Sequence, residues 1–323
     1  MTDSEHAVCN RRCCRLSWAI SFGRCVGRTS HRCLSAEFLF RMQATVNGMF
    51  LTDKPTWFLH SINSCGHLSC LSSGKPSYDK GLENYKPLGE IIQLANGAKA
   101  YFVKSEKSDK TVIAYYDIFG IEVLMTKYVV DQLSVRLMAN IIMPDVFRGK
   151  PWKISDFPPA SEKVLMDWIA EAGRYTIVKS DAQSSIEYLK KENIPTTNIG
   201  VLGFCWGGRQ ALNIIEDNTF LNTVKGAVSI HGAFIVDGDK DLIKNPVYFV
   251  QASDDPPLKG IYDFLIKKNA NLKKSMFDFV EGQKHGFAAA RGDYSDPKNK
   301  EAVERTINRS VEFFHAKLEL ALC

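Results

Sequence analysis

Cysteine is scarce over most of this chain. Seven of the nine cysteines precede residue 71, so only Cys205 and Cys323 occur after it. The bulk of the chain therefore has no framework of several disulfide bonds, and such a composition favours a reducing, cytoplasmic environment.

The cysteines near the start lack the spacing of a structural metal site. Zinc sites of this kind use paired Cys-x2-Cys knuckles with a second pair at a regular interval. Neither early group has that pattern; the first is Cys9, Cys13 and Cys14, and the second is Cys65, His67 and Cys70. We therefore expect no bound metal.

Long apolar runs are also absent. The longest one near the start, Leu16 to Phe22, is interrupted by serine and is far shorter than the roughly 20 residues that span a bilayer. It is not followed by the small-residue cleavage site typical of a secretory signal. We therefore expect neither a transmembrane helix nor a membrane partner.

The first 48 residues have seven arginines, no lysine and few acids. This composition is typical of a mitochondrial transit peptide, although Asp3 and Glu5 stand where such peptides avoid acids. We favour a disordered extension, or sequence upstream of a later start at Met42 or Met49. A mitochondrial location is the alternative to a cytoplasmic one.

Basic charge is lacking in the rest of the chain. The net charge is +5, of which +4 belongs to residues 1–48, and the remainder holds 34 basic and 33 acidic residues. A nucleic-acid binder needs a basic stripe on its folded part, and no such stripe is present. With 45% hydrophobic residues and ample length for one large core, the composition is that of an ordinary globular protein.

The segment 72–77, Ser-Ser-Gly-Lys-Pro-Ser, is typical of a loop. Glycine and proline interrupt regular structure, and serine competes for backbone hydrogen bonds. We place the domain boundary there. Residues 1–75 are expected to form an N-terminal extension, either disordered or a targeting segment, and residues 76–323 to form one domain.

After this boundary, short apolar runs rich in β-branched or aromatic residues alternate with longer segments of helical period. Helical spacing of apolar residues occurs over 177–189 and 303–318. The alternation predicts an α/β fold in which a mostly parallel sheet is covered by helices on both faces. The expected strands are 100–103, 111–118, 139–143, 199–204, 227–230, 247–251 and 276–280.

The most informative motif joins the expected strand 199–204 to a helical stretch. It reads Gly-x-Cys-x-Gly-Gly over residues 203–208, with Cys205 as its cysteine. A strand that turns sharply into a helix holds its turn residue in strained geometry, and flanking glycines make room for the turn. The motif thus predicts a nucleophile elbow with cysteine in the usual serine position. The helix N-terminus beside the sulfur favours a thiolate.

Two other interpretations of this motif fit less well. A dinucleotide-binding loop needs Gly-x-Gly-x-x-Gly and an acid about 20 residues later, and the glycine spacing here differs. A buried structural cysteine is the second alternative, because cysteine is common in protein cores.

Partners for the cysteine follow in the expected order. In this architecture an acid and then a histidine come after the nucleophile, each on a loop after a later strand. Asp254 and Asp255 follow one late strand, and His285 follows the last. His231 also ends a strand, but it precedes the acids, so we interpret it as a residue that lines the pocket.

Four motifs occur in order along the chain: Asp-Ile-Phe-Gly over 117–120, Pro-Asp-Val-Phe-Arg-Gly-Lys-Pro-Trp over 144–152, the elbow over 203–208, and His-Gly-Phe over 285–287 with Arg-Gly-Asp soon after. Together they resemble the dienelactone hydrolase (carboxymethylenebutenolidase) family, especially its fungal branch. The resemblance runs from about Tyr85 to the C-terminus. It implies an α/β-hydrolase fold that opens small lactones or esters with a Cys-His-Asp triad and without a metal or organic cofactor.

The resemblance also implies roles for single residues. By position, Cys205 is the nucleophile and His285 the general base. Asp255 is favoured over Asp254 as the acid, because it matches the register of the family's turn.

Other positions are expected to bind the substrate. The resemblance implies that Asp117 lies at the site, where bacterial relatives have a glutamate that interacts with the thiol. Arg291 is the nearest candidate for the arginine that binds a substrate carboxylate in the family. Backbone N–H groups of Ile118 and Trp206 are expected to form the oxyanion hole.

These roles predict a hydrolase of small lactones or carboxylic esters that works through a thioester acyl-enzyme. The expected partner is a small-molecule substrate, with neither nucleic acid nor membrane, and the sequence assigns no oligomeric state. A fold and a triad do not fix the substrate. A thioesterase or peptidase on the same fold is therefore an alternative, as is a catalytically silent ligand-binding relative.

Overall fold

The computed structural model describes residues 76–77, 79–106 and 108–318. The two early cysteine groups, the arginine-rich segment 1–48 and Cys323 lie outside the described residues, as does most of the expected boundary loop. Predictions that concern them stay predictions.

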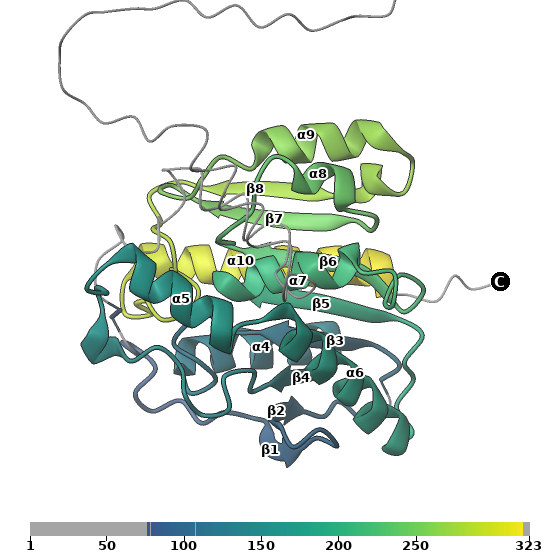
Figure 1. Cartoon of the computed structure of the whole chain (residues 1–323), viewed down its shortest axis with the longest axis horizontal. Helices are drawn as coiled ribbons and strands as arrows, with labels where there is room; N and C mark the ends of the chain where they lie inside the picture. Colours follow the sequence, from purple (N-terminus) through teal and green to yellow (C-terminus); the bar gives the residue numbers. More distant parts are fainter. Residues whose placement is uncertain (1–75, 78, 107, 319–323) are drawn as a thin grey trace, which may run out of the picture. The chain divides into compact units, whose positions relative to one another are not determined.

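One eight-stranded sheet forms the centre of the described part (Figure 1), in the order β1-β2-β4-β3-β5-β6-β7-β8. The first two strands pair antiparallel, β2 pairs antiparallel with β4, and all other neighbours are parallel. The sheet is therefore mostly parallel, as the sequence predicts. The strands are β1 (Glu90–Gln93), β2 (Lys99–Val103), β3 (Thr111–Tyr115), β4 (Asn140–Pro144), β5 (Ile199–Phe204), β6 (Val224–Ile230), β7 (Val247–Ala252) and β8 (Met276–Val280).

Helices cover both faces of this sheet, and Figure 1 shows α4 and α10 on one face and α5, α6 and α7 on the other. All residues of β3, β4, β5 and β7 are buried, because helices pack against both of their sides. The helices are α4 (Leu124–Leu137), α5 (Glu162–Ala172), α6 (Tyr175–Lys191), α7 (Trp206–Glu216), α8 (Asp239–Leu242), α9 (Lys259–Lys268) and α10 (Pro297–Leu318), with short 3-10 turns at Ile154–Asp156 and Leu272–Lys274. No helix among the described residues has the length and apolar character needed to cross a bilayer.

Two strand predictions need correction. The expected strand 111–118 ends at Tyr115, because the chain leaves the sheet there and turns back on Asp117, whose carbonyl accepts a hydrogen bond from the Gly120 N–H (3.1 Å). Strand β1 was not expected at all. It lies at the edge of the sheet and is mostly exposed, so its residues show no buried apolar face.

The topology gathers several loops at one edge of the sheet. Parallel strands present their carboxyl ends to the same side, so the loops after β3, β5, β6, β7 and β8 meet there. Each of the residues singled out by sequence follows the end of one of these strands. The fold therefore brings the candidate residues to one edge.

Candidate active site

Cys205 occupies the sharp turn between β5 and α7. Its backbone has φ 54° and ψ −118°, a conformation that costs a non-glycine residue of order 1–3 kcal/mol. Three backbone hydrogen bonds hold it: its N–H donates to the Ile230 carbonyl (3.1 Å), and its carbonyl accepts from the N–H groups of Gly208 (2.9 Å) and Ala233 (3.0 Å). Only 3% of the residue is exposed. The geometry is that of the expected elbow.

The glycines around Cys205 are required by close packing of backbone on backbone. A Cβ at Gly203 would stand 1.9 Å from the Gly207 carbonyl oxygen, and one at Gly207 would stand 2.3 Å from the Tyr115 carbonyl oxygen. At Gly208 a Cβ would meet the hydroxyl of Ser229 at 2.6 Å. Helix α7 can therefore approach β3, β5 and β6 only without side chains at these positions.

Gly203→Ala is expected to destabilise the protein severely, by more than about 3 kcal/mol, because the clashing atoms belong to backbone that cannot move aside cheaply. The matched control is Gly260→Ala in helix α9, where a Cβ meets nothing within 4 Å. Alanine favours helix over glycine by up to about 1 kcal/mol, so this variant should unfold at the wild-type urea concentration or slightly above. Urea unfolding followed by circular dichroism measures the stability of both variants. Equal stability of the two variants would contradict the packing argument.

His285 and Asp255 form a buried pair on the loops after β8 and β7. The Nδ1 atom of His285 and the Oδ1 atom of Asp255 are 2.6 Å apart, and both side chains are inaccessible to solvent. The other oxygen of Asp255 accepts a hydrogen bond from the Ala252 N–H (2.7 Å), which fixes the carboxylate. Asp254 instead accepts a hydrogen bond from the backbone N–H of His285 (2.6 Å). Thus Asp255 meets the imidazole ring, whereas Asp254 fixes the backbone that carries it.

Asp117 links the loop after β3 to the loop that carries His285. Its carboxylate is 3% exposed and accepts hydrogen bonds from the N–H groups of Phe119 (2.9 Å) and Ala290 (3.2 Å). The Ile118 carbonyl accepts from the Trp152 N–H (2.9 Å), which fixes the peptide on the other side of this turn. Asp117 therefore positions the Ile118 backbone relative to the His285 loop.

Trp206, directly after the cysteine, is the first residue of α7 and is fully buried. Its indole packs against the rings of Phe147 (centroids 4.7 Å apart) and Tyr116 (6.3 Å). The N–H groups in the first turn of a helix have no partner within the helix. The Trp206 N–H is one of these and belongs to the peptide bond that follows Cys205.

His231 is packed against the His285 ring. It is fully buried with a positive φ of 39°, and its ring lies edge-on to His285, with centroids 5.2 Å apart, and to Phe287 at 5.5 Å. Neither of its ring nitrogens has a hydrogen-bond partner among the described residues. Burial above all, and then the charges of His285 and Arg291, hold its pKa well below the ordinary value of 6.5. We expected a residue that lines the pocket, and the structure shows it fully buried and edge-on to the His285 ring.

His231→Phe is expected to reduce the loss of folding stability at acidic pH. The unfolded chain binds a proton at His231 near pH 6.5 and the folded chain does not, so the free energy of unfolding falls as the pH drops below that value. When the pH is lowered from 7.5 to 5.5, the free energy of unfolding measured with urea should fall by about 1 kcal/mol more in the wild type than in His231→Phe. His315→Gln, which removes a part-exposed histidine from α10, is the control and should retain the wild-type difference. A His231→Phe variant with the full wild-type loss would overturn this expectation.

Arg291 lies across Gly286, the residue after His285. Its Nη1 atom is 3.1 Å from the place that a Cβ of Gly286 would take, and Gly286 has a φ of +89°. The guanidinium carbon stands 5.1 Å from the centroid of the Phe157 ring. The side chain is partly exposed, so the charge reaches both the His285 loop and solvent.

One buried group near the site was not predicted. Arg209 of α7 is 1% exposed and forms an ion pair with Asp239 (2.6 Å), whose carboxylate also accepts from the Val236 N–H (2.8 Å). This pair fixes the loop after β6, which carries His231, against the helix that follows the cysteine. The only sequence signal is a charged residue directly after the glycines of the elbow.

No group of three histidine, cysteine, aspartate or glutamate side chains that could hold a metal ion occurs among the described residues. The candidate residues offer instead a thiol, an imidazole, a carboxylate and backbone donors. These groups are suited to acyl transfer.

Comparison with known proteins agrees with this arrangement. An eight-stranded, mostly parallel sheet with a strained strand-to-helix turn at its carboxyl edge is typical of an α/β-hydrolase fold. Residues 98–318 match the sequence model of the dienelactone hydrolase family. The chain belongs to this family, whose members hydrolyse lactones and esters.

Individual relatives are distant. A human protein named carboxymethylenebutenolidase homolog is 28% identical over 238 residues, which cover 72% of this chain and 92% of the relative. An uncharacterized AIM2 family protein of Schizosaccharomyces pombe is 25% identical and covers 72% of this chain and 93% of its own length. The family and its fungal members confirm the resemblance seen in the sequence.

Solved structures share the fold. A dienelactone hydrolase-like promiscuous phosphotriesterase from metagenomic libraries superposes with a TM-score of 0.54 at 15% identity, covering 72% of this chain and 98% of its own. A dienelactone hydrolase from Anabaena variabilis gives a TM-score of 0.51 at 13% identity and covers 72% and 100%. These structures confirm the α/β-hydrolase fold.

Proposed function

We propose that this protein hydrolyses small lactones or carboxylic esters with Cys205 as nucleophile, His285 as general base and Asp255 as the triad acid. The observation that carries the proposal is the coexistence of two costly features at one edge of the sheet. One is a cysteine held in strained backbone geometry at the start of α7, and the other is a buried imidazole–carboxylate pair. A cysteine that only filled the core would need neither.

The thiol must become a thiolate before it can attack. A free cysteine with a pKa near 8.5 is mostly protonated at pH 7. In the proposed mechanism His285 accepts the thiol proton, and Asp255 fixes the tautomer of the ring and stabilises the imidazolium that forms. The N-terminus of α7 beside Cys205 adds a favourable field for the negative sulfur.

The reaction then proceeds in two steps. The thiolate adds to the acyl carbon, and the Ile118 and Trp206 N–H groups donate hydrogen bonds to the oxyanion. The bond from carbon to the leaving oxygen breaks, and that oxygen takes the proton from His285, which leaves a thioester. A water molecule then gives its proton to His285 and its oxygen to the acyl carbon, and the sulfur leaves and recovers a proton. In a lactone the leaving hydroxyl stays attached to the acyl chain, so release waits for the second step.

A substrate panel on the purified chain tests this proposal. It contains small aryl esters, unsaturated lactones, acyl thioesters and peptide amides of matched size. Turnover that is greatest on the lactones and esters supports the proposal. Preference for thioesters or amides would favour the alternative acyl hydrolases, and binding without turnover of any member would favour a silent ligand-binding relative.

Arg291→Ala is expected to weaken hydrolysis of anionic substrates selectively. The guanidinium beside His285 can form a bidentate hydrogen bond with a substrate carboxylate. Loss of that bond should weaken transition-state binding of a carboxylate-bearing lactone by about 1.5–3 kcal/mol, which is measured as a lower kcat/KM. A neutral ester of the same size should be little affected. Equal losses on both would identify Arg291 as a structural residue, and no loss on either would place it in solvent.

A further inference from the structure

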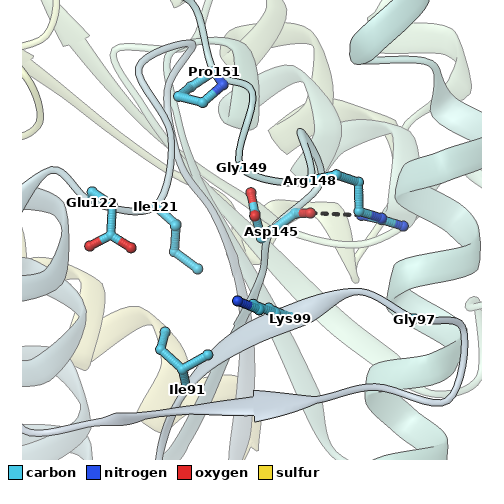
Figure 2. Close-up of a pocket in the computed structure, with 9 residues that line it drawn as sticks. All are labelled: Ile91, Gly97, Lys99, Ile121, Glu122, Asp145, Arg148, Gly149 and Pro151. Carbon is cyan, nitrogen blue, oxygen red and sulfur yellow. Dashed lines mark hydrogen bonds between the residues drawn. The ribbon is translucent and has the colours of Figure 1, made fainter.

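A cavity of about 440 Å³ is lined by residues of β1, of β2 and of the loops that follow β3 and β4 (Figure 2). This volume is within the range of about 300–1,000 Å³ typical of small-molecule sites. Its described lining includes none of the candidate active-site residues. The lining residues are Ile91, Gly97, Lys99, Ile121, Glu122, Asp145, Arg148, Gly149 and Pro151.

Two charged groups in this lining are already neutralised by ion pairs. Arg148 binds both oxygens of Asp181, at 2.7 and 2.8 Å. Glu122 pairs with Lys127 at 2.6 Å. Neither group therefore offers a full charge to a ligand.

The other two charged groups are in no ion pair within 4.0 Å among the described residues. Asp145 is only 7% exposed, and its carboxylate accepts one side-chain hydrogen bond, from the neutral Tyr116 hydroxyl (3.0 Å). Arg148 donates to the Asp145 backbone carbonyl (2.7 Å), and the Asp145 charge acts on the guanidinium, whose charged hydrogen bonds go to Asp181. A carboxylate so nearly buried is stabilised by a cationic donor. Lys99 supplies an exposed ammonium, and its backbone lies beside that of Asp145 because the Asp145 N–H donates to the Lys99 carbonyl (2.8 Å).

The remaining walls are apolar. Ile91, which is half exposed, Ile121 and Pro151 surround the space in Figure 2, and Gly97 and Gly149 leave it open. A complementary ligand thus carries one positive and one negative group close together, and an apolar body. The two charges of an α-amino acid are separated by a single carbon atom, so they suit a carboxylate and an ammonium at neighbouring backbone positions.

We propose that this cavity binds a zwitterionic α-amino acid with an aliphatic side chain. Asp145 accepts hydrogen bonds from the α-ammonium, Lys99 binds the α-carboxylate, and the side chain lies against Ile91, Ile121 and Pro151. The rival arrangement is a direct ion pair between Lys99 and Asp145, which would satisfy both charges and leave no binding site.

Isothermal titration of the full chain with L-leucine tests the site without using catalysis. Saturable binding is expected. Two analogues each remove one charge: 4-methylpentanoate lacks the ammonium, and leucinamide lacks the carboxylate. Each should bind at least about tenfold more weakly than leucine, because one charge-assisted contact is lost. Glycine, which lacks the side chain, should also bind more weakly.

Variants locate the binding. Lys99→Met changes an exposed side chain, so it should fold normally and bind leucine at least about tenfold more weakly. Asp145→Asn should do the same while keeping an oxygen for the Tyr116 hydroxyl. Lys104→Met removes a lysine just beyond the other end of β2 and should leave binding unchanged. Absence of saturable leucine binding, equal binding of leucine and 4-methylpentanoate, or full binding by Lys99→Met would each overturn the proposal.

Discussion

Cys205→Ala is expected to reduce ester and lactone turnover by at least about a thousandfold. Removal of a nucleophile leaves only the acceleration that backbone donors and substrate binding provide. The variant should stay folded, because alanine fills most of the volume of the thiol and keeps the Cβ in the same strained turn. Measurement of kcat on an aryl ester, with urea unfolding in parallel, separates loss of chemistry from loss of structure.

The control for this variant is Cys323→Ser, which removes the other cysteine that follows residue 71 in the sequence. It should retain wild-type kcat. A small electrophilic thiol reagent added to the wild type should label Cys205 and stop turnover in proportion to labelling. Wild-type activity in Cys205→Ala would exclude the thioester mechanism, whatever the labelling result.

Much of this site could be predicted because its signals are local. The elbow is set by residues within one turn of Cys205, where backbone passes too close to backbone for any residue except glycine. The strand over 199–204 was predicted to its exact ends, since it is a short apolar run that the elbow motif ends, and all of its residues are buried. The order of acid and histidine follows from the alternation of strands and helices along the chain.

Contacts between distant parts of the chain could not be predicted in the same way. Asp117 accepts a hydrogen bond from Ala290, which is 173 residues away. The adjacent acids Asp254 and Asp255 were separated in sequence only by the register of the family's turn, and the fold turns one carboxylate to the ring and the other to the backbone. Likewise, a histidine at a strand end gives no sign of whether it is buried, as His231 is.

Asp255→Asn is expected to lower kcat by about three to four orders of magnitude, as loss of a triad carboxylate does elsewhere. The Ala252 N–H binds one oxygen of the carboxylate, so the amide oxygen of asparagine should take that place and turn its NH2 group toward Nδ1 of His285. The ring would then carry its proton on the other nitrogen, the one needed to accept the thiol proton. The amide also cannot neutralise an imidazolium.

Asp254→Asn is the matched control, because it changes the adjacent carboxylate to the same amide. Its side-chain oxygen can still accept the hydrogen bond from the His285 N–H, so kcat should fall by less than about tenfold. Steady-state kinetics on one neutral ester, measured from pH 6 to 9, compares the two variants. A large loss in Asp254→Asn together with a small loss in Asp255→Asn would reassign the triad acid by one residue. Small losses in both would mean that His285 acts without a carboxylate partner, although the 2.6 Å contact with Asp255 argues for the opposite result.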